Sequence, residues 1–219
     1  MRLKFLTQIT LAGDAKIVKT IHGIMFANYE PHVTRYPDGT CVLASIGPNN
    51  PYTSATGLNE RVECILRSGI ALKTLSSPPL PVPRTNGISY EILPTPNMGL
   101  GMFASRDINK GDLILAERPL AVMPKSPYPS IFDVQRYPSF DWEDFIKPLF
   151  DRLTPENQAT FSALANSQIQ NGVGPLYGVT RTNAFCIEFG EGIYNQYSAV
   201  YQYLSRMNHR YEYFMYSFH

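Results

Sequence analysis

The sequence predicts a mainly β fold with an α-helical insert, an α+β arrangement. Three observations support this prediction. From residue 88 onward, short apolar runs alternate with clusters of Gly, Pro, Asn and Asp, which is typical of strands joined by tight turns. Residues 125–175 instead carry apolar side chains three and four positions apart, the period of a helix. A further strand-like run follows this insert.

Three strands are expected at the start of the predicted β fold. They are the short apolar runs Tyr90–Leu93, Met102–Ser105 and Leu113–Met123. Gly99-Leu100-Gly101 and Lys110-Gly111-Asp112 lie between them as turns, because glycine adopts positive φ without steric cost. Taken alone, a Gly-X-Gly sequence is most simply such a hairpin turn.

The insert is expected to contain two packed helices. Asp141 is suited to cap the first helix, and Pro148 should kink it. Thr154-Pro155-Glu156 is a second start signal, a capping hydroxyl followed by proline, and Asn171-Gly172 is a stop signal. The first helix has one apolar stripe, formed by Trp142, Phe145, Ile146, Leu149, Phe150 and Leu153.

Beyond the insert the pattern returns to a strand. Thr182–Phe189 is strand-like, and Tyr197–Met207 is expected to be a short helical or irregular turn that leads into Asn208-His209. Within the strand, Asn183 is expected to satisfy neighbouring backbone groups. Cys186 is expected to be a small core residue, because the sequence places no activating histidine beside it.

Residues 1–87 are predicted to form a separate N-terminal extension, and 88–219 the main domain. The boundary falls in residues 76–87, SSPPLPVPRTNG, whose prolines cannot enter a helix or a central strand. Within the extension, Pro37-Asp38-Gly39 is placed to form the turn of a hairpin. Leu58–Leu75 has apolar spacing compatible with a short helix.

Composition excludes several kinds of protein. The formal net charge is +1 and the basic residues are scattered, so direct contact with nucleic acid is not expected. The three cysteines include no CxxC pair, which predicts neither a metal site nor a disulfide framework and fits a reducing compartment. No apolar run reaches the roughly 18 residues of a membrane span. We therefore expect an intracellular protein of the nucleus or cytoplasm, without membrane contact.

The order of parts in Tyr90–Met123 resembles the opening of a SET domain. These parts are a short strand, a Gly-Leu-Gly turn, a small-residue strand, an Asn-Lys-Gly-Asp turn and an apolar strand carrying Glu117. Arg181–Phe185 resembles the inner strand of that domain, which borders the substrate-lysine channel. Leu204–His209 is the sharpest match, because SET domains contain an Asn-His pair. The insert looks like that of fungal-type SET proteins.

SET domains are S-adenosylmethionine-dependent protein-lysine N-methyltransferases, and the resemblance implies this activity here. It implies a protein substrate that presents a lysine side chain, with histones among the candidates. No catalytic residue and no metal ligand is carried over from the family. The cofactor-binding residues that the resemblance implies are Gly99, Gly101, Met102, Phe103, Asn208 and His209.

The chain departs from the family pattern directly after His209. Arg210 stands where the family has serine, and the tyrosines that follow lie in no matching motif. The SET-type fold is therefore expected to be incomplete at its C-terminus, with impaired activity and weak or no cofactor binding. We expect the native transcript to continue into the missing part. The alternatives are a non-catalytic SET-like protein-interaction module and an unrelated β domain whose turns imitate the motifs.

Overall fold

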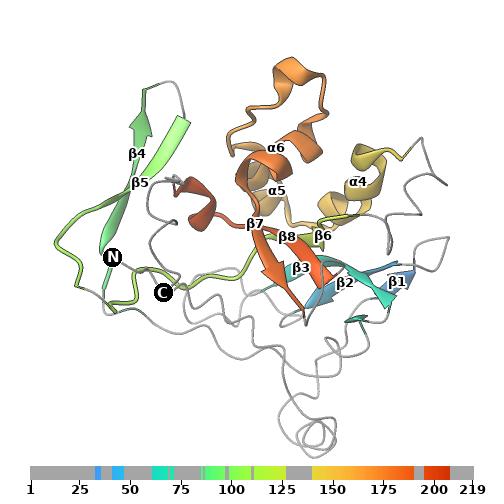
Figure 1. The fold of residues 1–219 in the computed structure, drawn as a ribbon, viewed down its shortest axis with the longest axis horizontal. Helices are drawn as coiled ribbons and strands as arrows, with labels where there is room; N and C mark the ends of the chain where they lie inside the picture. The colour runs from blue at the N-terminus through green and yellow to red at the C-terminus, as the bar shows by residue number, and fades with distance from the viewer. Residues whose placement is uncertain are drawn as a thin grey trace, which may run out of the picture.

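The computed structural model has an α+β architecture, as the sequence predicts (Figure 1). It combines a six-stranded mixed sheet, a separate two-stranded hairpin and, within the described residues, three α-helices. The described residues are 33–35, 41–46, 61–68, 70–71, 85, 87–96, 99–109, 111–126, 140–189 and 195–207.

The six-stranded sheet joins strands from both ends of the chain. Its order is β1-β2-β3-β6-β8-β7, and β3 and β6 are parallel while the other pairs are antiparallel. Strand β3 precedes the proline-rich residues 76–87 and β6 follows them, so the predicted boundary does not separate two sheets. The strands are β1 (Val33–Arg35), β2 (Cys41–Ile46), β3 (Val62–Arg67), β6 (Ala121–Pro124), β7 (Phe185–Glu188) and β8 (Gln196–Val200).

The N-terminal region confirms one local prediction and corrects another. Val33 of β1 lies opposite Ala44 of β2, so the strands around the predicted turn pair as a hairpin. The turn residues themselves lie outside the described part. The predicted helix over Leu58–Leu75 is wrong, because Val62–Arg67 is a strand. Residues 62–66 are all buried, which suits a central strand covered on both faces. Apolar spacing alone does not distinguish such a strand from a buried helix.

The two-stranded hairpin confirms two of the predicted strands. It consists of β4 (Tyr90–Thr95) and β5 (Gly99–Ala104), and it lies apart from the large sheet in Figure 1. The Gly-Leu-Gly sequence is the start of β5, whereas the prediction made it a turn. Gly99 has a φ of 73° and follows the turn, and Gly101 lies within the strand.

The predicted strand Leu113–Met123 is mostly wrong. Strand β6 begins only at Ala121, and residues 113–119 pair with no other strand in the described part of the chain. Pro119 has no backbone N–H to donate to a ladder. The prediction for Tyr197–Met207 also changes, because Gln196–Val200 is strand β8 and only Leu204–Arg206 forms a short 3₁₀ helix, η4.

The helix start signals are confirmed. Helix α4 (Trp142–Arg152) is capped by Asp141, whose Oδ1 accepts the backbone N–H of Glu143 at 2.7 Å, and Pro148 lies inside it. Helix α5 (Pro155–Ser162) is capped by Thr154. The predicted stop is wrong, because α5 ends at Ser162. Gly172, with a φ of 69°, ends instead the short 3₁₀ helix η2 (Ile169–Asn171).

Helix α6 (Pro175–Asn183) was not predicted, and it corrects the strand assigned to Thr182–Phe189. Only Phe185–Glu188 is a strand, so Arg181 to Asn183 are helical. The first turn of α6 is stabilised from another helix. Glu143 of α4 accepts the backbone N–H groups of Leu176 at 3.1 Å and Tyr177 at 2.6 Å. No sequence pattern close to α6 predicts that Glu143 caps it.

Glu143→Ala is expected to destabilise the protein by about 1–2 kcal/mol, because it removes the acceptor from two N–H groups at a helix N-terminus. Gly174→Ala should also destabilise it, since a Cβ there would clash with Glu143 Cγ. In the double variant the clash is absent, so the two losses should be less than additive. Urea denaturation measures all three. Strict additivity would contradict this account of Gly174.

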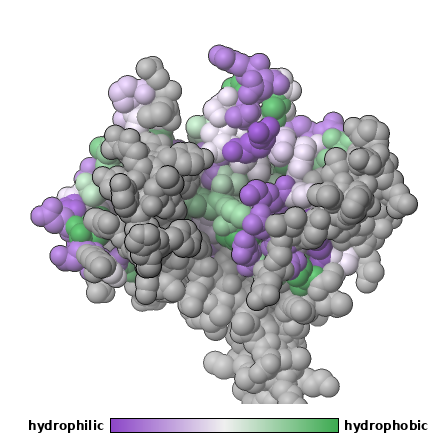
Figure 2. Space-filling view, in the orientation of Figure 1, coloured by the Kyte–Doolittle hydropathy of each residue, from purple (hydrophilic) through white to green (hydrophobic). Residues whose placement is uncertain are grey.

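The sheet is buried on both faces. On one face Ile65 and Met123 pack with the helices, which contribute Leu149 and Phe161. On the other face Leu66 and Val122 pack with the residues that follow β8. Hydrophilic residues cover much of the helical top of the molecule in Figure 2, and hydrophobic residues lie nearer its centre. None of the helices in the described residues is long and apolar enough to cross a membrane.

Candidate functional site

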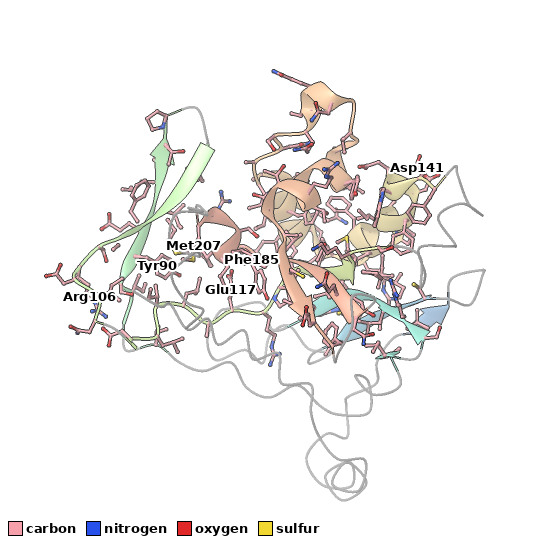
Figure 3. The ribbon with its side chains drawn as sticks, viewed as in Figure 1. Tyr90, Arg106, Glu117, Asp141, Phe185 and Met207 are labelled. Atoms are coloured by element: carbon pink, nitrogen blue, oxygen red, sulfur yellow. The ribbon has the colours of Figure 1, made fainter. Side chains whose placement is uncertain are left out.

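The hairpin and the end of the described chain lie side by side. Strand β5 contacts η4, and the rings of Tyr90 on β4 and Tyr203 before η4 have centroids 6.2 Å apart. Figure 3 shows Tyr90, Glu117 and Met207, from three different parts of the chain, in the region between the hairpin and the sheet. The fold therefore brings the Gly99–Phe103 strand close to the segment that precedes Asn208-His209.

The two glycines of β5 have different surroundings. Among the described residues, a Cβ on Gly99 would meet no atom within 4 Å, so these residues leave its backbone open to an approaching ligand. A Cβ on Gly101 would lie 2.7 Å from Thr95 Cγ2 and 3.2 Å from the Phe103 ring. Gly101 is therefore required by the packing of the hairpin itself. Met102 is half-buried, and Phe103 is 44% exposed.

The structure places four of the six predicted cofactor-binding residues. Asn208 and His209 lie outside the described residues. They follow Met207 directly in the sequence, and Met207 is half-buried against the apolar cluster on the face of the sheet opposite the helices. The candidate site is therefore described through the hairpin and through the contacts around Met207.

Glu117 holds the start of η4. Its Oε1 accepts the backbone N–H of Leu204 at 2.6 Å and of Tyr203 at 3.0 Å, and its Oε2 lies 3.2 Å from the same Tyr203 nitrogen. The free N–H groups at the start of a helical turn need acceptors, and η4 has no capping side chain of its own. Glu117 supplies them from a segment 87 residues earlier.

A second set of hydrogen bonds fixes the same segment to α6. Ser205 Oγ accepts the backbone N–H of Tyr201 at 2.9 Å and donates to the carbonyl of Asn183 at 3.0 Å. The Asn183 side chain donates to the carbonyls of Ala165 at 2.6 Å and Val179 at 2.7 Å. Asn183 thus satisfies backbone groups as predicted, but from the end of a helix. The strand predicted over Arg181–Phe185 is not formed, because Arg181 to Asn183 belong to α6 and β7 begins only at Phe185.

The prediction for Cys186 is wrong. Its side chain is exposed on β7, an edge strand of the large sheet. The buried thiols are those of Cys41 and Cys64, and none of the three cysteines forms a disulfide. Burial raises the pKa of Cys64, with a smaller contribution from the charge of Glu63. Neither buried thiol is a candidate nucleophile, because nucleophilic attack requires the thiolate and access to a substrate.

Burial also sets the electrostatics around Glu117. It raises the pKa of the Glu117 carboxyl from 4.5 to about 7, although the Leu204 and Tyr203 N–H groups and the charge of Arg206 act in the opposite direction. Burial and then the Glu117 charge raise the pKa of Tyr201. The same two causes, with a contribution from Tyr203, raise the pKa of Tyr90. One half-buried carboxyl therefore interacts with several tyrosines and one arginine.

Tyr201 carries a buried hydroxyl that makes no hydrogen bond within the described part of the chain. Tyr201→Phe is expected to stabilise the protein by about 1 kcal/mol, because burying an unpaired hydroxyl costs free energy. Tyr197→Phe is the matched control. The Tyr197 hydroxyl accepts the backbone N–H of Arg67 at 3.2 Å, so its loss should destabilise by about 1 kcal/mol. Thermal melts should shift in opposite directions, and equal losses would contradict the prediction.

Comparison of the chain with protein-family models, with curated proteins and with solved structures found no match. Among the described residues, no group of three His, Cys, Asp or Glu side chains could hold a metal ion. The geometry of the site is therefore the remaining basis for a functional proposal. Sequence reasoning noted Glu117 within an apolar run, but assigned it no role.

Proposed function

We propose that this chain is a SET-type protein of the fungal kind, with S-adenosylmethionine-dependent protein-lysine N-methyltransferase activity. The observation that supports this best is the contact between β5 and η4. It unites the two sequence segments that most resemble a SET domain, the Gly-Leu-Gly strand and the approach to Asn208-His209. Such proximity is what a shared cofactor site requires.

The residues of the site fit this cofactor in part. Gly99 leaves its backbone open, as close approach of a ligand requires, whereas the space over Gly101 is filled by Thr95 and Phe103. When bound, S-adenosylmethionine supplies a methyl group on a positively charged sulfur. The chain's contribution would be to orient the lysine amine in line with that methyl group, for which a misplacement of about 1 Å costs roughly a hundredfold in rate.

A non-catalytic protein-interaction module is the second candidate. One observation favours it, namely that the hairpin exposes Leu93 (44%), Leu100 (43%) and Phe103 (44%). Exposed apolar side chains gathered on one element mark many protein-contact surfaces. This candidate needs neither an open cofactor site nor a lysine channel.

Titration calorimetry with S-adenosylmethionine tests the cofactor site. We expect weak, saturable binding, and Asn208→Ala should lower the affinity by about tenfold if the amide bonds the ligand. Asn171→Ala is the control, because Asn171 lies in η2, outside the site. Absence of saturable binding to folded protein at millimolar cofactor would remove the methyltransferase proposal.

Radiolabelled methyl transfer separates the two candidates. A histone mixture serves as the lysine-bearing substrate, and the same mixture with chemically blocked lysines serves as its control. Transfer that requires free lysines would support the enzyme. Cofactor binding without transfer would favour the non-catalytic module.

A further inference from the structure

The β4–β5 hairpin is attached to the rest of the protein by few contacts. It belongs to its own two-stranded sheet and lies apart from the large sheet in Figure 1. Among the described residues, no hydrogen bond or ion pair links residues 88–105 to another part of the chain. The main contact of the hairpin with another described element is the packing of β5 on η4. The rings of Tyr90 and Tyr203 meet at this contact, with centroids 6.2 Å apart.

The hairpin is connected within itself far more closely. Residues 90–95 of β4 pair with residues 99–104 of β5, and the Ser105 N–H continues the ladder by donating to the Ser89 carbonyl at 3.0 Å. At the turn, Thr95 Oγ1 donates to the Gly99 carbonyl at 2.9 Å. These contacts hold the two strands together independently of the large sheet, so a movement of one strand carries the other with it.

A glycine with positive φ lies beyond each end of the hairpin. Gly87 has a φ of 84° and precedes Ile88, which is 76% exposed. Gly111 has a φ of 101° and lies in the loop that follows β5. A Cβ on either glycine would meet no atom of the described residues within 4 Å. Hinges in proteins are a few loop positions that absorb a change in φ and ψ, and glycine makes that change at the lowest steric cost.

The opposite side of the contact is fixed to the body of the protein. Glu117 accepts the N–H groups of Tyr203 and Leu204 at the start of η4. Ser205 bonds to Tyr201 and to the end of α6 through Asn183. Because η4 is anchored and the hairpin is not, a relative movement of the two elements is a movement of the hairpin.

We propose that the β4–β5 hairpin is a hinged flap, which turns as one body about Gly87 and Gly111 and closes where Tyr90 meets Tyr203. Strand β5 carries four of the predicted cofactor-binding residues, so opening of the flap would separate them from η4. This consequence rests on the proposed function, whereas the movement itself does not.

Distance measurement between two spin labels on the full chain tests the flap. One label is attached to Cys186, the exposed cysteine of β7, and the other to Leu100→Cys on β5, where the side chain is 43% exposed. We expect a main distance and a minor population at a second distance. Tyr90→Ala removes the ring contact and should raise the minor population by about five- to tenfold. Glu91→Ala, at the next and exposed position of β4, is the control and should leave both populations unchanged.

A substitution at a hinge provides a second test. The closed hairpin requires a positive φ at Gly111, which residues with a Cβ rarely adopt, so Gly111→Ala should favour the second distance by about fivefold. Gly172→Ala is the matched control. Gly172 also has a positive φ, 69°, and equally open surroundings among the described residues, but it ends η2, outside the hairpin. Its substitution should leave the distances unchanged.

Hydrogen exchange separates a hinge movement from local unfolding of the hairpin. In Tyr90→Ala the Ser105 amide, which bonds to Ser89, should keep its protection within about twofold of the unsubstituted chain. Loss of this protection, or distances that change in neither Tyr90→Ala nor Gly111→Ala, would overturn the flap.

Addition of S-adenosylmethionine to the labelled protein tests the proposed function separately. A shift of the populations toward one distance would support a cofactor site on the flap. No shift would count against cofactor binding, while the response to Tyr90→Ala and Gly111→Ala in the absence of ligand would still establish the hinge.

Discussion

Replacement of Glu63 by alanine is expected to lower the free energy of unfolding by about 3–5 kcal/mol, the usual cost of breaking a buried ion pair from one side. Glu63 is 2% exposed in the central strand β3. Its carboxylate accepts hydrogen bonds from Ser45 Oγ at 2.6 Å and from Arg61 Nε at 2.8 Å. It also lies 3.5 Å from Arg152 Nε at the end of α4. The carboxylate thus links two strands and a helix.

Glu63→Gln removes the negative charge but keeps nearly the same side-chain shape. The amide oxygen can still accept one of these hydrogen bonds, so its loss of stability should be smaller than that of Glu63→Ala. Glu156→Ala is the exposed control, at the start of α5, and should change stability by less than about 1 kcal/mol. Urea denaturation gives each value. An alanine variant within about 0.5 kcal/mol of wild type would show that the cluster does not stabilise the fold.

Phe161→Ala, made on its own in the wild-type protein, is expected to lower the free energy of unfolding by about 3–5 kcal/mol. This is the usual range for removing a buried aromatic ring. Phe161 is completely buried, and its ring packs edge-on against Phe150 with centroids 5.6 Å apart. Within α5 only Asn157 and Phe161 are buried. The attachment of α5 to the sheet therefore depends mainly on this one side chain.

Phe161→Leu keeps most of the apolar volume and should cost less than about 1.5 kcal/mol. Thermal or chemical denaturation distinguishes the two variants. Hydrogen exchange should also show that α5 amides lose protection first in Phe161→Ala. Equal stability of the alanine and leucine variants would mean that the cavity is refilled by neighbouring side chains.

Sequence patterns were sufficient wherever an element is defined by its own residues. The caps at Asp141 and Thr154 bond to N–H groups two or three positions along the chain, so the side chain and its partner are both visible in the sequence. The β4–β5 hairpin and the pairing of β1 with β2 are likewise local, because each joins neighbouring strands across a short turn. The α+β class follows from these elements.

Tertiary structure decided the elements whose partners lie far away. Val62–Arg67 became the central strand because β2 and β6 cover its two edges, although its apolar spacing also fits a helix. Helix α6 is capped by a glutamate 33 residues before the N–H that it accepts. Periodicity within one segment contains no information on such partners, since they come together only when the chain folds.

The candidate site divides in the same way. The sequence by itself predicted Gly99, Gly101, Met102, Phe103 and the Asn208-His209 pair as cofactor-binding residues, through their resemblance to a known motif order, but it made Gly-Leu-Gly a turn and not the start of a strand. Only the tertiary structure revealed that Glu117 bonds to Leu204, 87 residues later, and that Gly101 serves the packing of its own hairpin. The half-buried carboxyl of Glu117 acquires its altered pKa from the groups that surround it in space, and those groups are not its neighbours in the sequence.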